Sequence, residues 1–184
     1  MSHWYQKTSL LLAAITLLLC GCNDDSIQDT YSRLAANFEF RYCATVPQMR
    51  GALSGSPGSF FTVRLANTIY VITSNDNLAN PYYYTKNDVD NRLLYLCRAG
   101  FIIGTPVLSS SLEAYDLACP NCYLTLVSRP LEFESRTLLR CTRCQCAYSL
   151  DDAQGILVEG KSSARVLMRY HVQYDGMNYL SVRN

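Results

Sequence analysis

Residues 165–174 read RVLMRYHVQY, and this stretch decides the fold class. Apolar residues stand at every second position from Val166 to Tyr174, alternating chiefly with polar ones. A period of two places successive side chains on opposite faces, so the stretch predicts a β-strand with one buried face. Asp175-Gly176 follows and favours a tight turn, and NYLSV at 178–182 then predicts the partner strand of a hairpin.

The rest of the chain shows the same preference for strands. Its 14 tyrosines, together with many Val, Thr and Ile residues, favour strands over helices. Residues 74–91 predict a long loop, and residues 30–37 predict one short helix. We therefore expect an all-β domain. Further strands are predicted at 59–65 (SFFTVRL), 68–73 (TIYVIT), 92–97 (RLLYLC), 101–108 (FIIGTPVL) and 114–118 (AYDLA).

The N-terminus predicts export. A short basic start at Lys7 precedes an apolar run from Leu10 to Leu19, which is too short to span a bilayer as a helix. This order is typical of a secretory signal peptide, and Gly21 provides the small residue that the peptidase needs. The stretch ending at Cys22 resembles a bacterial lipobox. The resemblance implies that residues 1–21 are removed and that Cys22 is lipidated.

The residues behind Cys22 add an expectation about location. Asn23-Asp24-Asp25 resembles the acidic export signals of Bacteroidetes lipoproteins, which implies the outer membrane, on its periplasmic or cell-surface face. Residues 22–37 would form a tether, and residues 38–184 are one domain by length. The formal net charge is +1 and no basic patch stands out, so we expect no nucleic-acid partner. A protein or glycan partner stays unidentified.

Two Cys-x-x-Cys pairs carry the strongest chemical signal. Cys119 and Cys122 form one pair, Cys141 and Cys144 form the other, and residues 123–140 separate them. This is the two-knuckle spacing of a four-cysteine metal site. A hairpin between the pairs brings four sulfurs around one ion as a tetrahedron. We expect a small metal-binding subdomain of zinc-ribbon or rubredoxin type, inserted at 117–148 and built from the loops 117–124 and 139–148.

Other roles for the cysteines remain open at this stage. An exported protein meets an oxidising compartment, so the thiols could form structural disulfides. They could also serve a thiol–disulfide oxidoreductase, although no strand–CxxC–helix context surrounds them. Cys146 is an additional thiol, either buried or an alternative ligand to Cys144. Cys43 and Cys97 lie outside the knuckles and could form a disulfide.

The C-terminal half resembles a Rieske domain, the fold that holds a [2Fe–2S] cluster. The similarity covers roughly residues 98–184 and looks most like the Rieske-like lipoproteins of Bacteroidetes. It implies a Rieske-like β-sandwich with both cluster loops in this region. The matching features are Cys119 in the first cluster loop, Cys141 in the second, the aromatic Tyr148, the turn glycines Gly155 and Gly160, and the closing hairpin 169–182.

The ligand set departs from that family. A Rieske cluster takes two cysteines and two histidines, whereas Asn121 and Cys144 occupy the two histidine positions here. The four remaining cysteines suit zinc, and mononuclear iron or an all-cysteine [2Fe–2S] cluster are the alternatives. Four thiolates leave no open coordination position, which favours a structural zinc in a binding or structural module over an enzyme. The alternative function is an iron-dependent electron-transfer protein.

No catalytic residue is predicted. His171 is the one histidine after the signal peptide and stands alone on a predicted strand, which favours a structural role. Asp151-Asp152 reads as a solvated turn. The tyrosines at 82–84 could stack on sugars or a partner, or fold back onto the sheet. Tyr123 and Gln145 follow the second cysteine of each pair, where zinc knuckles favour glycine.

Overall fold

The computed structural model describes residues 31–85 and 99–184. The predicted signal peptide, the lipidation site Cys22 and the predicted strand at 92–97 lie outside these residues. Among the residues described, no helix is long and apolar enough to cross a membrane. Strands make up most of the regular structure and the helices are few and short, which confirms the all-β prediction at that level.

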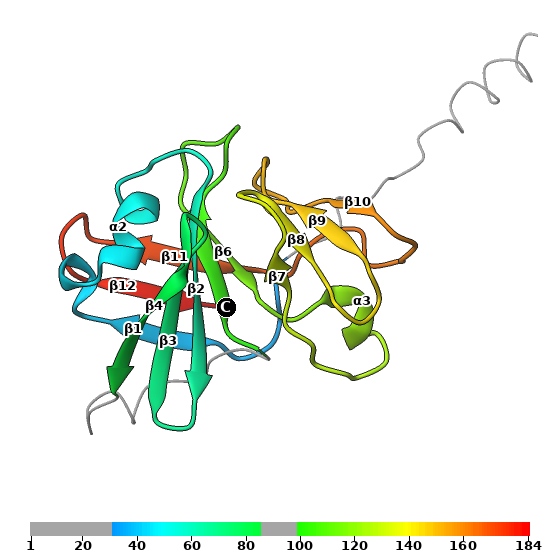
Figure 1. The fold of residues 1–184 in the computed structure, drawn as a ribbon, viewed down its shortest axis with the longest axis horizontal. Coiled ribbons are helices and arrows are strands. Elements are labelled where there is room, and N and C mark those ends of the chain that lie inside the picture. The colour runs from blue at the N-terminus through cyan, green and yellow to red at the C-terminus, as the bar shows by residue number, and fades with distance from the viewer. Residues whose placement is uncertain (1–30, 86–98) are drawn as a thin grey trace, which may run out of the picture.

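Eight antiparallel strands form the main sheet, in the spatial order β1-β12-β11-β6-β5-β2-β3-β4 (Figure 1). The sheet is curled, so that rings from its two edge strands meet: Phe40 of β1 lies 5.0 Å from the ring of Tyr84 of β4. The strands are β1 (Asn37–Phe40), β2 (Ser59–Ala66), β3 (Ile69–Ser74), β4 (Asn77–Thr85), β5 (Phe101–Thr105), β6 (Glu113–Asp116), β11 (Arg169–Tyr174) and β12 (Leu180–Arg183).

The C-terminal hairpin forms as expected, between β11 and β12. Tyr170 is buried and Val172 packs against the same core, which is the buried face that the alternation predicts. The carboxylate of Asp175 fixes the turn, because its Oδ1 accepts the backbone N–H groups of residues 177, 178 and 179 at 2.8–3.0 Å. This side-chain acceptor closes a wider loop than the Asp-Gly pair alone suggests.

Residues 117–168 leave the main sheet after β6 and return to it at β11. We call this segment the cysteine lobe. It contains a second sheet in the order β10-β9-β8-β7, which stands beside the main sheet in Figure 1. Its elements are α3 (Pro120–Tyr123), β7 (Glu132–Phe133), β8 (Leu138–Arg140), β9 (Ala147–Ser149) and β10 (Leu157–Glu159).

Two apolar cores lie against the main sheet, and side chains of its central strands enter one core or the other. In β2, Phe61 and Val63 belong to the first core and Phe60 to the second. In β5, Ile102 likewise joins the second core. Both faces of these strands are therefore covered, which explains why they read as continuous apolar runs.

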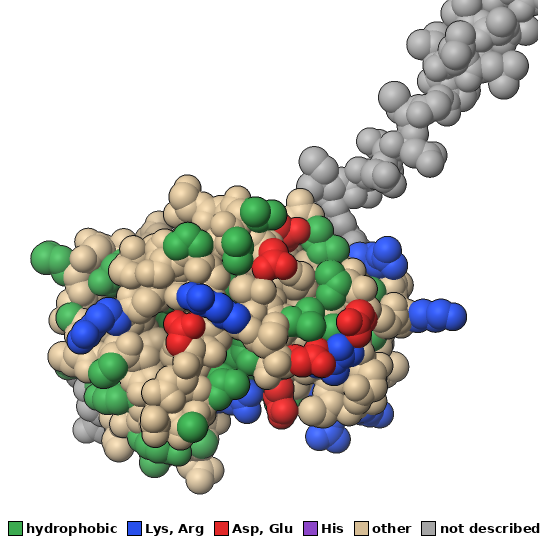
Figure 2. All heavy atoms as spheres, turned by 45° about the horizontal axis from the view of Figure 1, so that its top comes forward, with side chains coloured by type: hydrophobic (Ala, Val, Ile, Leu, Met, Phe, Trp, Pro, Cys, Tyr) green, Lys and Arg blue, Asp and Glu red, His purple; other side chains and the backbone are tan. Residues whose placement is uncertain are grey.

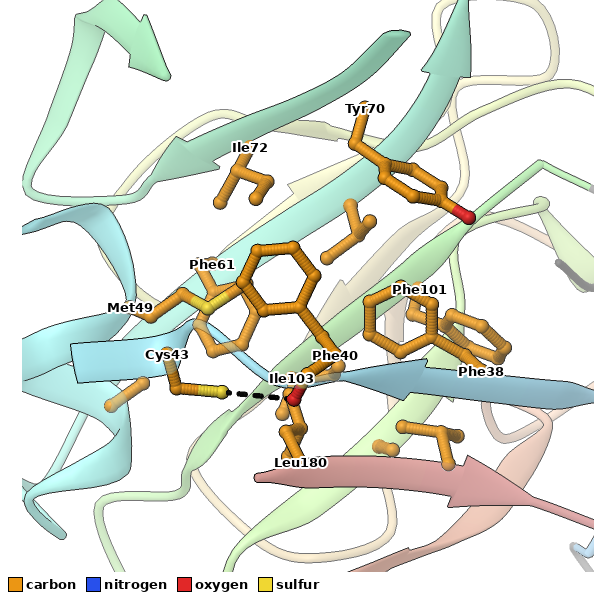
Figure 3. Packing of buried hydrophobic residues seen from close by; sticks show 14 of the residues in the cluster. Phe38, Phe40, Cys43, Met49, Phe61, Tyr70, Ile72, Phe101, Ile103 and Leu180 are labelled. Carbon is orange, nitrogen blue, oxygen red and sulfur yellow. Dashed lines mark hydrogen bonds between the residues drawn. The ribbon is translucent and has the colours of Figure 1, made fainter. Parts of the chain in front are cut away.

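The first core is closed by two short helices that the sequence pattern did not predict. These are the 3-10 helix η1 (Cys43–Thr45) and α2 (Pro47–Leu53), which contacts β2, β3 and β5. Figure 3 shows Met49 of α2 reaching from the helix to the side of the rings of Phe40 and Phe61. Pro47 occupies the first position of the helix, where its fixed φ is favourable. Seven residues are too few to give a helical period.

The second core attaches the cysteine lobe to the main sheet. Phe60, Ile102 and Tyr115 come from the sheet, and the Tyr115 hydroxyl donates to the carbonyl of Ala153 in the lobe at 3.0 Å. Burying each large side chain contributes about 1.5–3 kcal/mol. The lobe therefore depends on this core as well as on its own short strands. Its contribution is Leu117, Leu131, Leu139, Tyr148, Leu150, Leu157 and Leu167, with Cys119, Cys122, Cys141 and Cys146.

The helix predicted at 30–37 is wrong for the described part of that range. Tyr31 forms a parallel bridge with Arg169, and the backbone N–H of Ser32 donates to the Arg169 carbonyl at 2.8 Å. β1 then begins at Asn37. Pairing with the main sheet outweighs the weak helical preference of so short a segment.

The long loop predicted at 74–91 is also wrong for residues 77–85, which form β4. β4 pairs with β3 at the edge of the sheet, where Pro81 is tolerated. Tyr82 and Tyr84 pack against the first core, whereas Tyr83 is 64% exposed. Two of the three tyrosines therefore fold back onto the sheet, and one points outward.

Candidate metal centre

The first cysteine loop begins where β6 ends. Cys119 has an extended backbone and precedes the single turn α3, with Pro120 at the first helical position. The backbone N–H of Tyr123 donates to the Cys119 carbonyl at 3.1 Å. This turn places Cys119 and Cys122 on one side of the loop, as a Cys-x-x-Cys pair requires.

The left-handed residue of this loop is Leu126, not the residue after Cys122. Leu126 has φ 58°, and its N–H donates to the carbonyl of Tyr123 at 2.8 Å. The N–H of Val127 then reaches back to the carbonyl of Cys122 at 3.3 Å. Because the chain completes a helical turn before it reverses, Tyr123 needs no glycine-like conformation.

The second cysteine loop is a tight turn between β8 and β9. The N–H of Gln145 donates to the Cys141 carbonyl, and the N–H of Cys141 donates to the Cys146 carbonyl, both at 3.0 Å. Gln145 has φ 61°, so a non-glycine residue holds the left-handed conformation expected at this position of a knuckle. Its side-chain amide donates to the carbonyl of Thr142 at 2.9 Å and holds the turn closed.

The structure brings the four predicted cysteines together. Sγ atoms of Cys119, Cys122, Cys141 and Cys144 all lie within 4.8 Å of one another. The pairs Cys119–Cys144 and Cys122–Cys141 are each 3.6 Å apart, far beyond a disulfide bond length of about 2.05 Å. Sulfurs placed tetrahedrally at about 2.3 Å from one ion would be about 3.8 Å apart. The spacing therefore fits four thiolates around a single metal ion.

The electrostatics of the four thiols also suit a cation. Burial raises the pKa of Cys119, and burial raises that of Cys122 to about 11. Burial opposes ionisation of Cys144 too, but hydrogen bonds from Asn121 and from the backbone of Cys146 lower its pKa to about 6. Without a cation, burial disfavours the thiolate forms of Cys119 and Cys122, whereas Cys144 ionises more readily. A bound divalent ion stabilises the thiolate form of all four.

The centre is closed on most sides. Three of the four cysteines are buried, and Cys144 is partly exposed. Four protein thiolates complete a tetrahedral shell, so no position is left for substrate or water. The arrangement can hold a metal ion and anchor the lobe, and it offers no open site for hydrolysis.

Cys146 lies outside the group of four. It is 1% exposed and belongs to the second core, and burial raises its pKa to about 11. Gly160, with φ 96°, packs against it so closely that an added Cβ would lie 2.9 Å from the Cys146 sulfur. Cys146 is therefore a buried thiol of the core, and Cys144 is the fourth member of the cysteine cluster.

Cys43 lies far along the chain from this centre, in the first core. Its thiol donates to the carbonyl of Phe40 at 3.6 Å (Figure 3). Burial, and then the carboxylate of Asp175, raises its pKa to about 12. Cys97 lies outside the described residues, so the Cys43–Cys97 disulfide stays a prediction.

The other candidate residues are not part of the cysteine group. His171 is exposed on β11 and stacks on the ring of Tyr31 at 4.3 Å, while the Arg169 guanidinium lies 4.8 Å from the same ring. Asp152 accepts the backbone N–H groups of Gln154 and Gly155, as a turn residue does. The sequence resemblance singled out Asn121 and Gly160, but it did not predict that Asn121 hydrogen-bonds to Cys144 or that Gly160 packs against Cys146, because neither contact follows from cysteine spacing.

Comparison of the chain with family models, with curated proteins and with solved structures found no match to any of them. The four-cysteine cluster, which could hold a metal ion, therefore rests on its own geometry.

Proposed function

We propose that this protein is a membrane-anchored module in which Cys119, Cys122, Cys141 and Cys144 hold one structural zinc ion. The observation that carries the proposal is the mutual approach of the four sulfurs within 4.8 Å, inside a buried core. Zinc prefers four thiolates in a tetrahedron and has no need of an open position when its role is structural. The ion would fasten the two cysteine loops to each other and the lobe to the main sheet.

The spacing favours one metal ion over a dinuclear cluster. In an all-cysteine [2Fe–2S] cluster, two irons and two bridging sulfides separate one pair of thiolates from the other. Here each 3.6 Å sulfur pair joins a cysteine of the first loop to one of the second, and every remaining separation is 4.8 Å or less. Four sulfurs so evenly placed suit a single centre.

The Rieske-like relationship is part of this proposal. Support comes from the topology: the lobe carrying both cysteine loops is inserted between β6 and β11, and the chain ends in a closing hairpin. Those are the features that the sequence resemblance implies. With Asn121 and Cys144 at the histidine positions, a Rieske-like fold would hold a mononuclear metal centre in place of a redox cluster.

Membrane attachment rests on the N-terminal sequence, in which Gly21-Cys22 follows an apolar run. We place the lipid on Cys22 and the protein at the outer membrane. The acidic Asn23-Asp24-Asp25 motif supports export to that membrane.

Elemental analysis of the mature protein, purified with its cysteines intact, tests the metal assignment. We expect about one zinc per chain, a colourless solution and loss of the zinc in Cys141→Ser. Cys146→Ala is the matched control, because it removes a thiol from the same loop but not from the group of four, and it should keep the metal. Metal-free protein with alkylation-resistant cysteines would instead indicate disulfides, and rapid thiol–disulfide exchange would indicate an oxidoreductase.

Mononuclear iron is the second candidate, and the partial exposure of Cys144 favours it. An exposed ligand gives an electron a short path to a partner, which a purely structural ion does not require. Iron in the elemental analysis, with visible charge-transfer bands and a reversible redox wave, would replace the zinc proposal by an electron-transfer function.

A further inference from the structure

One end of the cysteine lobe presents apolar and basic side chains that the fold itself does not use. We call this surface the knuckle tip and define it as Leu124, Leu126, Arg129, Arg143 and Lys161. Leu124 is 59% exposed and Leu126 is 81% exposed. Leu126 also has a left-handed backbone, which is unfavourable for a non-glycine residue. A strained leucine that gains nothing from burial points to a contact outside this chain.

The two leucines are held in place by the metal loop. Thr125 donates its hydroxyl to the Cys122 carbonyl at 2.8 Å, and the N–H of Val127 donates to the same carbonyl. Leu126 lies between these two bonds. The tip is therefore presented by a turn that the cysteine centre orders, and little entropy is left to lose when it binds.

Three exposed cations lie on chain segments next to cysteines of the lobe. The carbonyl of Arg129 accepts the N–H of Cys119 at 2.7 Å, Arg143 lies inside the second cysteine pair, and the backbone of Lys161 hydrogen-bonds to Cys146. All three side chains are exposed, and none forms an ion pair with a described residue.

Nearby acidic groups do not cancel this charge. Glu134 and Glu159 share Arg140, each at 2.8 Å, so this triad keeps one net negative charge, and Glu132 of β7 is an unpaired carboxylate of the small sheet. The three cations of the knuckle tip exceed these two negative charges by one. Figure 2 shows Lys and Arg side chains projecting from the edge of the half of the molecule that holds the lobe, with hydrophobic and acidic side chains on the face beside them. The surface combines exposed leucines with an excess of positive charge.

The attachment point of the chain brings this surface near the membrane. Tyr31 is bridged to Arg169, the residue that directly follows the lobe. Cys22 precedes Tyr31 by so few residues that the link reaches at most about 30 Å when fully extended. A protein lipidated at Cys22 therefore keeps the lobe close to the headgroups.

We propose that the knuckle tip docks on an anionic phospholipid surface, with Leu124 and Leu126 entering the interface and the three cations facing lipid phosphates. The proposal rests on the lipid anchor of the proposed function. A lipid surface suits the observations better than an acidic protein does. The cations stand on three separate segments of the lobe, and a fluid headgroup layer adapts to such scattered charges without a complementary shape.

Tryptophan fluorescence of the mature lipidated protein tests the inference. Trp4 is the one tryptophan of the chain and lies in the predicted signal peptide, so Leu126→Trp would supply the one tryptophan of the mature form, which excitation at about 295 nm selects over tyrosine. In vesicles containing phosphatidylglycerol we expect a blue-shifted emission that brominated lipids quench. Leu78→Trp, placed on the exposed edge strand β4, is the matched control and should show neither change.

A second experiment tests whether docking depends on the positive charges, by removing them or by adding salt. In the Leu126→Trp background, Arg143→Gln with Lys161→Gln should weaken docking by about 5-fold per charge removed, and high salt should do the same. An unshifted emission in anionic vesicles, or a shift that survives both charge changes, overturns the inference. So does a shift with an acidic polypeptide but not with vesicles.

Flotation of the same samples separates this inference from the proposed anchor. Protein that floats with vesicles but shows no shift keeps its lipid anchor and loses the docking surface. Protein that fails to float lacks the anchor, and the docking proposal falls with it. Zinc content is measured in parallel for every variant, because Leu126 and Arg143 lie in the cysteine loops, and a lost shift counts against docking only where the zinc is retained.

Discussion

At the scale of single residues, the cysteine centre depends on two left-handed positions that are not glycine. Leu126 ends the first cysteine loop at φ 58°, and Gln145 ends the second at φ 61°. Both are held by hydrogen bonds to carbonyls of their own loop. The loops therefore store a small strain, which the packing of the second core and the proposed metal bonds offset.

Substitution of Gln145 tests the strain in the second loop. Gln145→Gly should leave the stability of the metal-loaded protein unchanged or raise it by up to about 1 kcal/mol, because glycine adopts positive φ freely. Gln145→Val should lower it by about 1–2 kcal/mol, since a β-branched residue resists that conformation. Urea unfolding of both variants measures the difference. Equal midpoints for the two would contradict the left-handed assignment.

The buried thiol of Cys43 leads us to expect that the folded protein loses stability at alkaline pH. Burial raises its pKa from an ordinary value of 9.0 to about 12, so the folded protein holds the thiol proton where the unfolded chain releases it. The corresponding stability is fully present below pH 9 and is lost as the pH rises from 9 to about 12. Cys43→Ser, whose hydroxyl does not ionise there, should show a shallower decline of the urea midpoint across this window. A parallel decline in both proteins would contradict the prediction.

At the scale of elements, the two sheets differ in what holds them. The main sheet has eight strands and a core of aromatic rings, whereas the lobe has strands of two or three residues. Sheets with such short strands have few ladder hydrogen bonds and depend on other stabilising contacts. In the lobe these are the second core and the cysteine centre, which share the three buried residues Cys119, Cys122 and Cys141.

Removal of the metal should therefore open the lobe before the main sheet. In chelator-treated protein we expect hydrogen exchange to accelerate in β8 and β9, while β2 and β3 keep their protection. Cys144→Ser should reproduce this pattern without chelator, and Cys146→Ala should not. Loss of protection that is equal in both sheets would mean that the centre stabilises the whole domain as one unit.

At the scale of the whole molecule, the lobe is an insertion that also serves as a cover. It leaves the main sheet after β6, packs over Phe60, Ile102 and Tyr115, and returns at β11. The face it covers would otherwise expose a continuous apolar surface. The same return point, Arg169, receives Tyr31 from the N-terminal side, so lobe and proposed anchor meet at one place.

Anchoring itself is tested at Cys22. Cys22→Ser should move the protein from the membrane fraction to the soluble fraction, or leave it with its signal peptide uncleaved, because no thiol remains to carry the lipid. Cys20→Ser is the matched control and should stay with the membrane, since Cys20 precedes the predicted cleavage site. Immunoblots of separated fractions, with the mass of the N-terminal peptide, check both variants. Cys22→Ser protein that is cleaved after Gly21 and still stays in the membrane fraction would contradict lipidation at this residue.

Patterns with a fixed local period were predictable from the sequence. The alternation at 165–174 gave the C-terminal hairpin, and the apolar runs gave β2, β3, β5 and β6. β4 was missed because Asn, Pro and Asp around it are typical of loops, and its pairing with β3 is a tertiary contact. The helix α2 was missed because seven residues give no periodic signal.

The sequence by itself determined which cysteines could share a metal ion, because two Cys-x-x-Cys turns at this separation can close around one centre. Only the tertiary structure decided between Cys144 and Cys146. Cys146 directs its side chain into the second core, because β9 pairs with β8 and Gly160 packs closely against this cysteine. The left-handed backbone of Gln145 reverses the chain between the two cysteines, so Cys144 faces the other three sulfurs. Cysteine spacing is a covalent property of the chain, whereas the direction of a side chain is set by the strands and core that surround it.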